Sequence, residues 1–230
     1  MRRESLKPNP GELPRIIPVF PLTGVLLLPR GQLPLNIFEP RYLAMVRDVL
    51  KDEQRLIGML QPKSPNPDDN RGISLAETQK PELYKTGCAG RITSFTEGED
   101  GRYMLTLTGI CRFDISEEIT EKDGYRRVFA DYSRFINDVE ILDDTNIDRE
   151  NLLKIVKKFF ARQKIETSWS AIKATPTERL VTSLAMSCPF GANERQALLE
   201  TPNFTDRVQM LLTLLEMTLL APGDSGDKSH

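Results

Sequence analysis

Few residues in this sequence have the type and spacing that nucleophilic or metal-dependent catalysis requires. The one histidine, His230, is the last of 230 residues, and chain ends are seldom held in a fixed geometry. This excludes Ser-His-Asp and Cys-His triads and His-rich zinc, iron or copper sites. Cys88, Cys111 and Cys188 lie far apart and form no C-x-x-C pair, which predicts reduced, partly buried thiols. We expect neither a metal ion nor a cofactor.

Ser170 and Lys173 match the S-x-x-K pattern, in which a lysine activates a serine one helical turn away. The flanking stretch 167–170 is mostly polar, and the companion motif S-D-N is absent from the sequence. The phosphate-binding patterns G-x-x-x-x-G-K-[ST] and G-x-G-x-x-G are absent as well. We therefore interpret the match as a coincidence and predict that the chain is not an enzyme.

A group of basic residues and the single tryptophan each allow two interpretations. The basic residues lie mostly along one expected helix and are Lys154, Lys157, Lys158, Arg162 and Lys164. They could contact phosphates, but no aromatic residue accompanies them on that face for base stacking, which favours a solvated helix surface. Trp169 lies in a polar stretch between helices, as a partial core residue or as an exposed anchor for a partner.

Charged residues in the first half of the chain provide two further candidates. Glu39 and Arg41 flank Pro40 where an expected strand meets an expected helix. A carboxylate there could act as a general base, but no second acid or metal ligand is near in sequence, so we favour a structural ion pair. Three arginines on different expected strands are a candidate anion site if they converge: Arg91, Arg112 and Arg126.

The composition is that of an ordinary globular chain without a strong charge bias. Hydrophobic residues make up 39%, the net charge is −2 and the pI is about 5.7, so nothing attracts the chain to nucleic acid or an anionic membrane. The first residues are charged and precede no apolar segment, unlike a signal peptide. The run Val25–Leu28 is far too short to span a bilayer. We predict a cytoplasmic protein without a membrane or nucleic-acid partner.

The first half is predicted to be mainly β-structure. Apolar alternation and turn residues indicate strands over 15–20, 33–38, 56–60, 88–96, 102–115 and 126–132. Pro40 fits the first turn of a helix, and Gly109 marks a kink or bulge within a strand. Residues 61–80, rich in proline and aspartate, form a long surface loop that is either functional or disordered.

The second half is predicted to be helical. Capping motifs over Thr145–Asp148 and Thr175–Glu178 mark helix starts, and amphipathic stripes follow each of them. We expect five segments: a flexible tail (1–14), a β subdomain (15–137), an acidic linker (138–146), a helical subdomain (147–221) and a disordered tail (222–230).

Two neighbouring motifs resemble the opening signature of Lon protease N-terminal domains. Pro18-Val-Phe-Pro-Leu22 is similar to the family's P-L-F-P-L, and Leu33-Pro-Leu-Asn-Ile-Phe-Glu-Pro-Arg-Tyr42 to its L-P-L-x-I-F-E-x-R-Y. Gly87–Ile92, Asp100–Phe113 and Glu194–Glu200 resemble later landmarks of the family, so the resemblance covers about residues 15–220. The signature positions, which we expect to be structural, are Pro18, Phe20, Pro21, Pro34, Phe38, Glu39, Arg41, Tyr42, Gly101, Arg112 and Phe113.

The resemblance implies an α+β fold in which a PUA-like β pseudo-barrel is followed by an α-helical bundle. In the full protease this domain precedes an ATPase module and a Ser-Lys peptidase module, and neither is recognisable in the sequence. The chain therefore resembles the stand-alone Lon-domain proteins, and a peptidase S16 family label would not imply peptidase activity.

The domain holds polypeptide substrates in the full protease, which implies a non-catalytic module that binds exposed apolar segments of other proteins. An adaptor role in protein quality control would extend this function. The expected peptide contacts are Val25, Leu26, Leu27 and Trp169, with burial of the aliphatic run in the core as the alternative. An RNA-binding PUA-like protein and a small-molecule enzyme without a usable histidine are the alternative functions, and the oligomeric state is left open.

Overall fold

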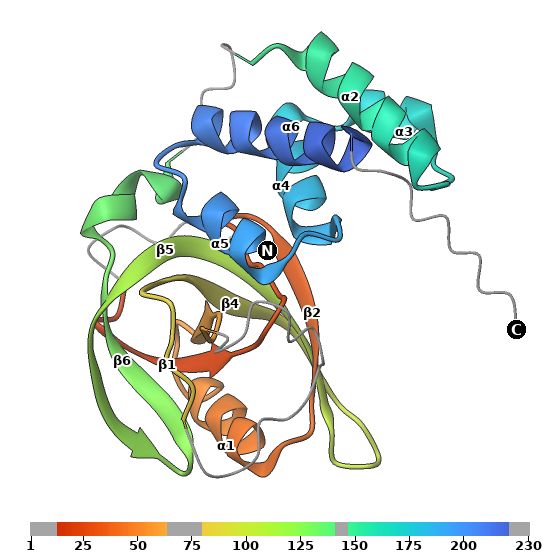
Figure 1. Ribbon diagram of the computed structural model, residues 1–230. Coiled ribbons are helices and arrows are strands. Elements are labelled where there is room, and N and C mark those ends of the chain that lie inside the picture. Colours follow the sequence, from red (N-terminus) through yellow and green to blue (C-terminus); the bar gives the residue numbers. More distant parts are fainter. Residues whose placement is uncertain (1–12, 64–79, 141–146, 221–230) are drawn as a thin grey trace, which may run out of the picture.

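The computed structural model describes residues 13–63, 80–140 and 147–220 and shows strands followed by helices, an α+β fold (Figure 1). The first part contains β1 (Ile16–Pro21), β2 (Gln32–Ile37), α1 (Pro40–Val49), β3 (Leu56–Leu60), β4 (Thr86–Glu97), β5 (Tyr103–Lys122) and β6 (Tyr125–Asp131). The second contains the 3-10 helix η2 (Ser133–Val139), α2 (Arg149–Arg162), α3 (Trp169–Ala174), α4 (Thr177–Ser187), α5 (Ala192–Glu200) and α6 (Phe204–Leu220).

The six strands form one sheet in the order β2-β5-β4-β3-β1-β6. Only the β1–β3 pair is parallel among the strand pairs of the described residues. The long strand β5 pairs with β4 and β2 along its first half and with β6 along its second half. The ladder from β5 through β4, β3, β1 and β6 therefore returns to β5, and β2 remains at the edge.

Gly109 allows the first loop of the chain to approach β5. A Cβ atom at Gly109 would lie 2.0 Å from the carbonyl oxygen of Leu28, which is a backbone atom. The Arg30 amide donates to the Gly109 carbonyl at 2.7 Å, and the Gly109 amide donates to Gly31. The β4–β5 register shifts beside Gly109, which agrees with the predicted bulge.

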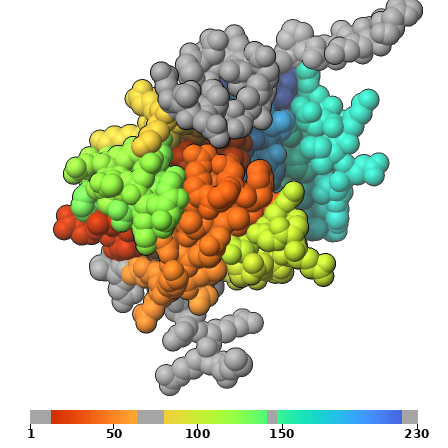
Figure 2. All heavy atoms as spheres, turned by 90° about the horizontal axis from the view of Figure 1, so that it is seen from below, coloured from red at the N-terminus to blue at the C-terminus, as the bar shows by residue number. Residues whose placement is uncertain are grey.

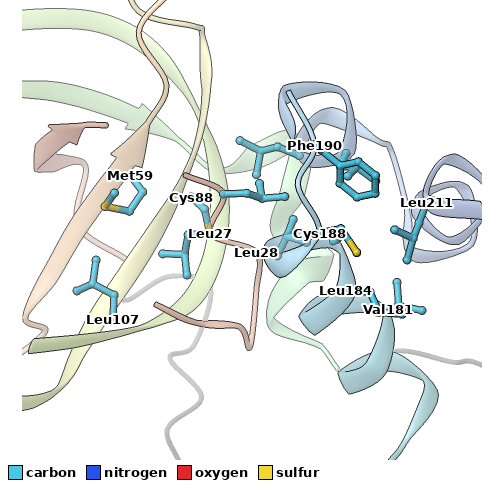
Figure 3. Packing of buried hydrophobic residues seen from close by; sticks show 14 of the residues in the cluster. Leu27, Leu28, Met59, Cys88, Leu107, Val181, Leu184, Cys188, Phe190 and Leu211 are labelled. Atoms are coloured by element: carbon cyan, nitrogen blue, oxygen red, sulfur yellow. The ribbon is translucent and has the colours of Figure 1, made fainter. Parts of the chain in front are cut away.

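Buried hydrophobic residues of the described part form two clusters, and the larger one is a core that strands and helices share. The aliphatic run enters this core, and Leu26, Leu27 and Leu28 are 2%, 2% and 0% exposed. Figure 3 shows Leu27 on the side of the sheet and Leu28 close to the helical residues Leu184 and Cys188. The predicted boundary between a β and a helical subdomain thus crosses a continuous apolar cluster.

Buried polar contacts also join the two halves. Arg112 of β5 forms a salt bridge with Asp138 of η2 at 2.8 Å, and its Nη1 donates to the carbonyls of Leu199 in α5 and of Thr201 just after it. Asp138, the first residue of the predicted acidic linker, is 7% exposed and lies within η2. Its buried charge is tolerated there because Arg112 compensates it.

The helix starts and the tail boundary differ slightly from the predictions. Asp148, not Thr145, caps α2, because its side chain accepts from the Asn151 amide; residues 141–146 lie outside the described part. Thr175 ends α3 and donates its hydroxyl to the Ala171 carbonyl, so α4 begins at Thr177. Leu13, which the prediction places in a flexible tail, is 8% exposed and belongs to the core.

The predicted loop over 61–80 falls mainly outside the described residues, but its ends are ordered. Gln61 is 2% exposed, and Pro62 and Leu83 form an isolated β-bridge. In the described residues, no helix has the length and apolar character needed to cross a membrane.

Candidate peptide-binding groove

An apolar groove of about 310 Å³ lies beside the edge strand β2. Its walls come from β2, from the end of β1 with the residues after it, and from the start of α1. The lining residues are Phe20, Leu22, Val25, Leu33, Pro34, Leu35, Asn36, Ile37, Phe38, Glu39 and Tyr42. Signature residues of the sequence thus meet in one surface feature.

The alternation of β2 determines which side chains face the core. Leu33 and Leu35 are half-buried against the core and Ile37 is buried, whereas the residues between them are exposed. The ladder continues from Gly31, whose carbonyl accepts from Gly109, so the odd-numbered residues direct their backbone groups to β5. Pro34 therefore lies where its missing N–H faces the free edge, as is usual for proline in edge strands.

Two closely packed aromatic rings, tilted by 48° to each other, belong to the lining of the groove. The ring centroids of Phe20 and Tyr42 are 4.2 Å apart, and the Arg41 guanidinium lies 4.6 Å from the centre of the Tyr42 ring. Burial, with a smaller effect from Glu39, raises the pKa of Tyr42, so its hydroxyl stays neutral at physiological pH. Glu39 accepts from the Nη2 of Arg41 at 2.8 Å, which leaves the groove almost without net charge.

Phe38 is an exposed apolar side chain at this groove. It is 60% exposed, and the Arg102 guanidinium lies 5.8 Å from its ring centre. Phe95 on the neighbouring hairpin is 38% exposed and contacts Tyr103 edge-on. In Figure 2 the surface of α1 and its preceding residues (orange) lies beside the β4–β5 hairpin (yellow-green). An exposed aromatic side chain beside an apolar groove is typical of binding surfaces.

The structure separates the four residues expected to contact a peptide. Val25 lines the groove and is half-buried. Leu26 and Leu27 are buried in the core and offer no surface to a partner. This agrees with the alternative prediction that the aliphatic run enters the core. Trp169 lines a different pocket between α2 and α3, and Figure 1 shows these two helices at the opposite end of the molecule from α1.

The remaining signature residues lie away from the groove. Pro18 and Pro21 belong to β1, and Gly101 has a φ of +75° in the β4–β5 turn, which favours glycine. Phe113 is fully buried. Its ring lies so close to Gly58 that a Cβ atom added there would be 2.8 Å from the Phe113 Cζ atom. These positions support the sheet that carries the groove.

The arginines considered as an anion site have separate partners. Arg126 forms a bidentate pair with Glu118 at 2.6 Å, and Arg112 binds Asp138. Arg91 lies in β4, where its Nε has no hydrogen-bond partner among the described residues. The structure therefore shows no common site for the three guanidinium groups within the described part of the chain.

The S-x-x-K residues lie on the exposed helix α3. The Ser170 hydroxyl lies 2.9 Å from that of Ser168, and Lys173 is exposed. A companion motif of the same pattern, K-T-G, is present in the sequence at residues 85–87. It lies at the start of β4, where Thr86 donates to Asp114 at 2.6 Å, and Figure 1 shows α3 far from β4. The two motifs do not form a common site.

Comparison with known proteins identifies the family. The family model for the ATP-dependent protease La (LON) substrate-binding domain matches residues 16–217. The chain belongs to this family. The LON domain described here is 25% identical over 217 residues to the Lon protease of Anaeromyxobacter dehalogenans, covering 90% of this chain and 24% of that protein. It is 24% identical over 206 residues to the Lon protease of Brevibacillus choshinensis, covering 87% and 25%.

Solved structures of LON domains share the fold. The Lon N-terminal domain protein from Xanthomonas campestris superposes with a TM-score of 0.57 at 22% identity, covering 87% of this chain and 97% of that one. The N-terminal domain of the Mycobacterium avium complex Lon protease gives 0.57 at 16% identity, covering 87% and 98%. The chain spans about a quarter of the length of the curated Lon proteases it matches, so the match concerns their substrate-binding domain.

Proposed function

We propose that this LON domain is a non-catalytic module that binds extended apolar segments of other proteins in the groove beside β2. The observation that carries the proposal is the exposed Phe38 at an apolar, almost uncharged groove. Membership of the substrate-binding family supports the same function. Leaving a large aromatic side chain in water is unfavourable, and a bound apolar segment would remove it from water.

The free edge of β2 supports an extended conformation for the bound segment. The backbone groups of Gln32, Pro34 and Asn36 face away from β5, so a segment alongside β2 would find hydrogen-bond partners at this edge. The groove accommodates a few side chains, and burying one leucine or phenylalanine contributes roughly 1.5–3 kcal/mol. We therefore expect weak, reversible binding, which suits a module that samples many clients.

A peptide titration with two matched variants tests the proposal. The probe is a fluorescein-labelled neutral peptide of alternating leucine and serine, and binding is followed by fluorescence anisotropy. Phe38→Ser is expected to weaken binding about tenfold or more, because exposed aromatic anchors dominate such contacts. Met104→Ser is the control, since Met104 is 55% exposed on the strand that pairs with β2 but does not line the groove.

Thermal unfolding of both variants shows whether they remain folded. Equal binding by the wild type and Phe38→Ser would contradict the proposal. So would equal losses in both variants. Tight binding of RNA that weakens with salt and competes with the peptide would instead support the RNA-binding alternative.

Finer features of the fold and setting belong to the same proposal. We propose that the ladder returning to β5 is the PUA-like pseudo-barrel, supported by the pairing of β5 with both β4 and β6. The packing of α2, α4 and α5 against α6 supports a helical bundle. An adaptor role in protein quality control and a cytoplasmic location remain predictions from the sequence.

A further inference from the structure

The exposed face of α2 carries positive charge in a chain that is negative overall. Residues 150–173 contain six lysines or arginines and two glutamates, whereas the whole chain has a net charge of −2. Lys154, Lys157 and Lys158 are exposed, and none of them has an ion-pair partner among the residues that the structure describes. Arg162 differs, because it donates to the carbonyl of Leu219 at the end of α6.

A pocket of about 340 Å³ lies directly beside this basic face. It is formed by the C-terminal turns of α2, the following segment and the first residue of α3. The rings of Phe160 and Trp169 are 6.4 Å apart and tilted by 32°, and Ile165 is 46% exposed. Lys157 lines the pocket and also belongs to the basic face, so the charged and apolar parts are continuous.

We propose that this surface, the α2–α3 site, docks an acidic polypeptide segment that carries one apolar anchor residue. Lysines without internal partners attract carboxylates and set the orientation of the partner. The apolar pocket accepts the anchor side chain, and a half-buried tryptophan is a typical centre of such contacts. In Figure 1, α2 and α3 lie at the opposite end of the molecule from α1, whose start lines the β2 groove, so the site would act independently of client binding there.

The pocket favours a polypeptide over a nucleic acid. Nucleic-acid surfaces stack bases on exposed ring faces along a basic track. Here the two rings are only partly exposed and line a concave pocket with Glu166. Two half-buried rings tilted by 32° suit one inserted side chain rather than a row of stacked bases.

Trp169 provides a direct signal for this site because it is the only tryptophan in the chain. The probe is a synthetic peptide of about twelve aspartate and glutamate residues with one central leucine and no aromatic residue. We expect a saturable change in tryptophan emission that weakens as NaCl rises from about 50 mM to about 500 mM, because salt screens exposed charges. The neutral groove peptide should leave the emission unchanged.

Two variants that retain Trp169 test the two parts of the site. Lys154→Glu combined with Lys158→Glu should weaken binding about tenfold, as expected for two exposed pairs turned repulsive. Ile165→Ser removes an exposed apolar side chain of the pocket and should weaken binding about threefold or more. Lys85→Glu is the matched control, because Lys85 is an exposed lysine beside β4, and it should bind like the wild type.

Several outcomes would overturn the proposal. One is the absence of a saturable signal with the acidic peptide, and another is unchanged affinity in the charge-reversal variant. A peptide with glycine in place of the leucine should bind at least about tenfold more weakly, and equal binding would show that the pocket takes no anchor. A single-stranded RNA that binds more tightly and depends on the same lysines would assign the face to nucleic acid.

Discussion

Replacing Arg112 by methionine tests how the sheet and the helices are held together. The variant removes two 2.8 Å hydrogen bonds from the Asp138 carboxylate, together with the donors to the carbonyls of Leu199 and Thr201. The side chains of Arg112 and Asp138 are only 3% and 9% exposed, so water does not replace the lost partner. Leaving a buried charge unpaired costs about 3–5 kcal/mol. This is a large part of the free energy of unfolding of a typical domain, which is about 5–15 kcal/mol.

Urea unfolding followed by circular dichroism measures this loss of free energy. A domain of this size loses about 2–4 °C in Tm per kcal/mol, so the thermal midpoint of the same variant should fall by about 6–20 °C. Lys51→Met is the control, because the Lys51 side chain is 76% exposed in its 3.0 Å pair with Asp48. That change should cost less than about 1 kcal/mol.

The double variant Arg112→Met with Asp138→Leu separates the buried charge from lost packing. Because Asp138→Leu removes the carboxylate that Arg112→Met leaves without its guanidinium partner, the double variant should recover about 1–3 kcal/mol relative to Arg112→Met. A cost of Arg112→Met below about 1 kcal/mol would refute the reasoning. A double variant that is no more stable than Arg112→Met would show that the unpaired carboxylate is not the cause.

Two further predictions concern the backbone and the thiols. Gly109→Ala should cost about 1–3 kcal/mol in urea unfolding, because its Cβ would meet the Leu28 carbonyl oxygen; an unchanged midpoint would contradict this close approach. Burial raises the pKa of Cys111 to about 12 and of Cys188 to about 11, and it also raises the pKa of Cys88. At about pH 8, all three thiols of the native protein should therefore resist iodoacetamide, whereas those of the urea-unfolded protein should react. Mass spectrometry measures the adducts, and adducts on the native protein would contradict the prediction. Because the thiols have higher pKa values in the native than in the unfolded protein, their contribution to the free energy of unfolding is fully present below about pH 8.5. It decreases as the pH rises above that value.

Elements with a local cause were predictable from the sequence. β3 coincides with the predicted strand over 56–60, and α1 begins at Pro40 as expected. An apolar run and a proline at the first helical position act within a few residues. The turn at Asp123 and Gly124 is equally local, since both residues have positive φ angles.

Features that depend on a distant partner were not predictable. The acidic composition around Asp138 indicates a linker between the two halves of the chain and gives no sign of a buried ion pair. Its partner Arg112 lies 26 residues earlier, and only the packing of η2 against β5 brings the two together. The aliphatic run around Leu27 is compatible with exposure or burial in the sequence alone. The run is buried because helices pack against it, and its partners in the cluster, such as Leu184, lie more than 150 residues later in the chain.

The sequence indicates the candidate groove only through the family signature, and that signature contains both core residues and exposed groove residues. Phe113 is 0% exposed and Tyr42 is 6% exposed, so loss of folding stability alone would explain a defect on replacing either one. Phe38 is 60% exposed and lines the groove, so a role in the core cannot account for it. Among these three residues, Phe38 is the one whose replacement separates binding from folding. A Phe38 variant that unfolds at the wild-type temperature but no longer binds the apolar peptide would therefore assign recognition to the groove rather than to the fold.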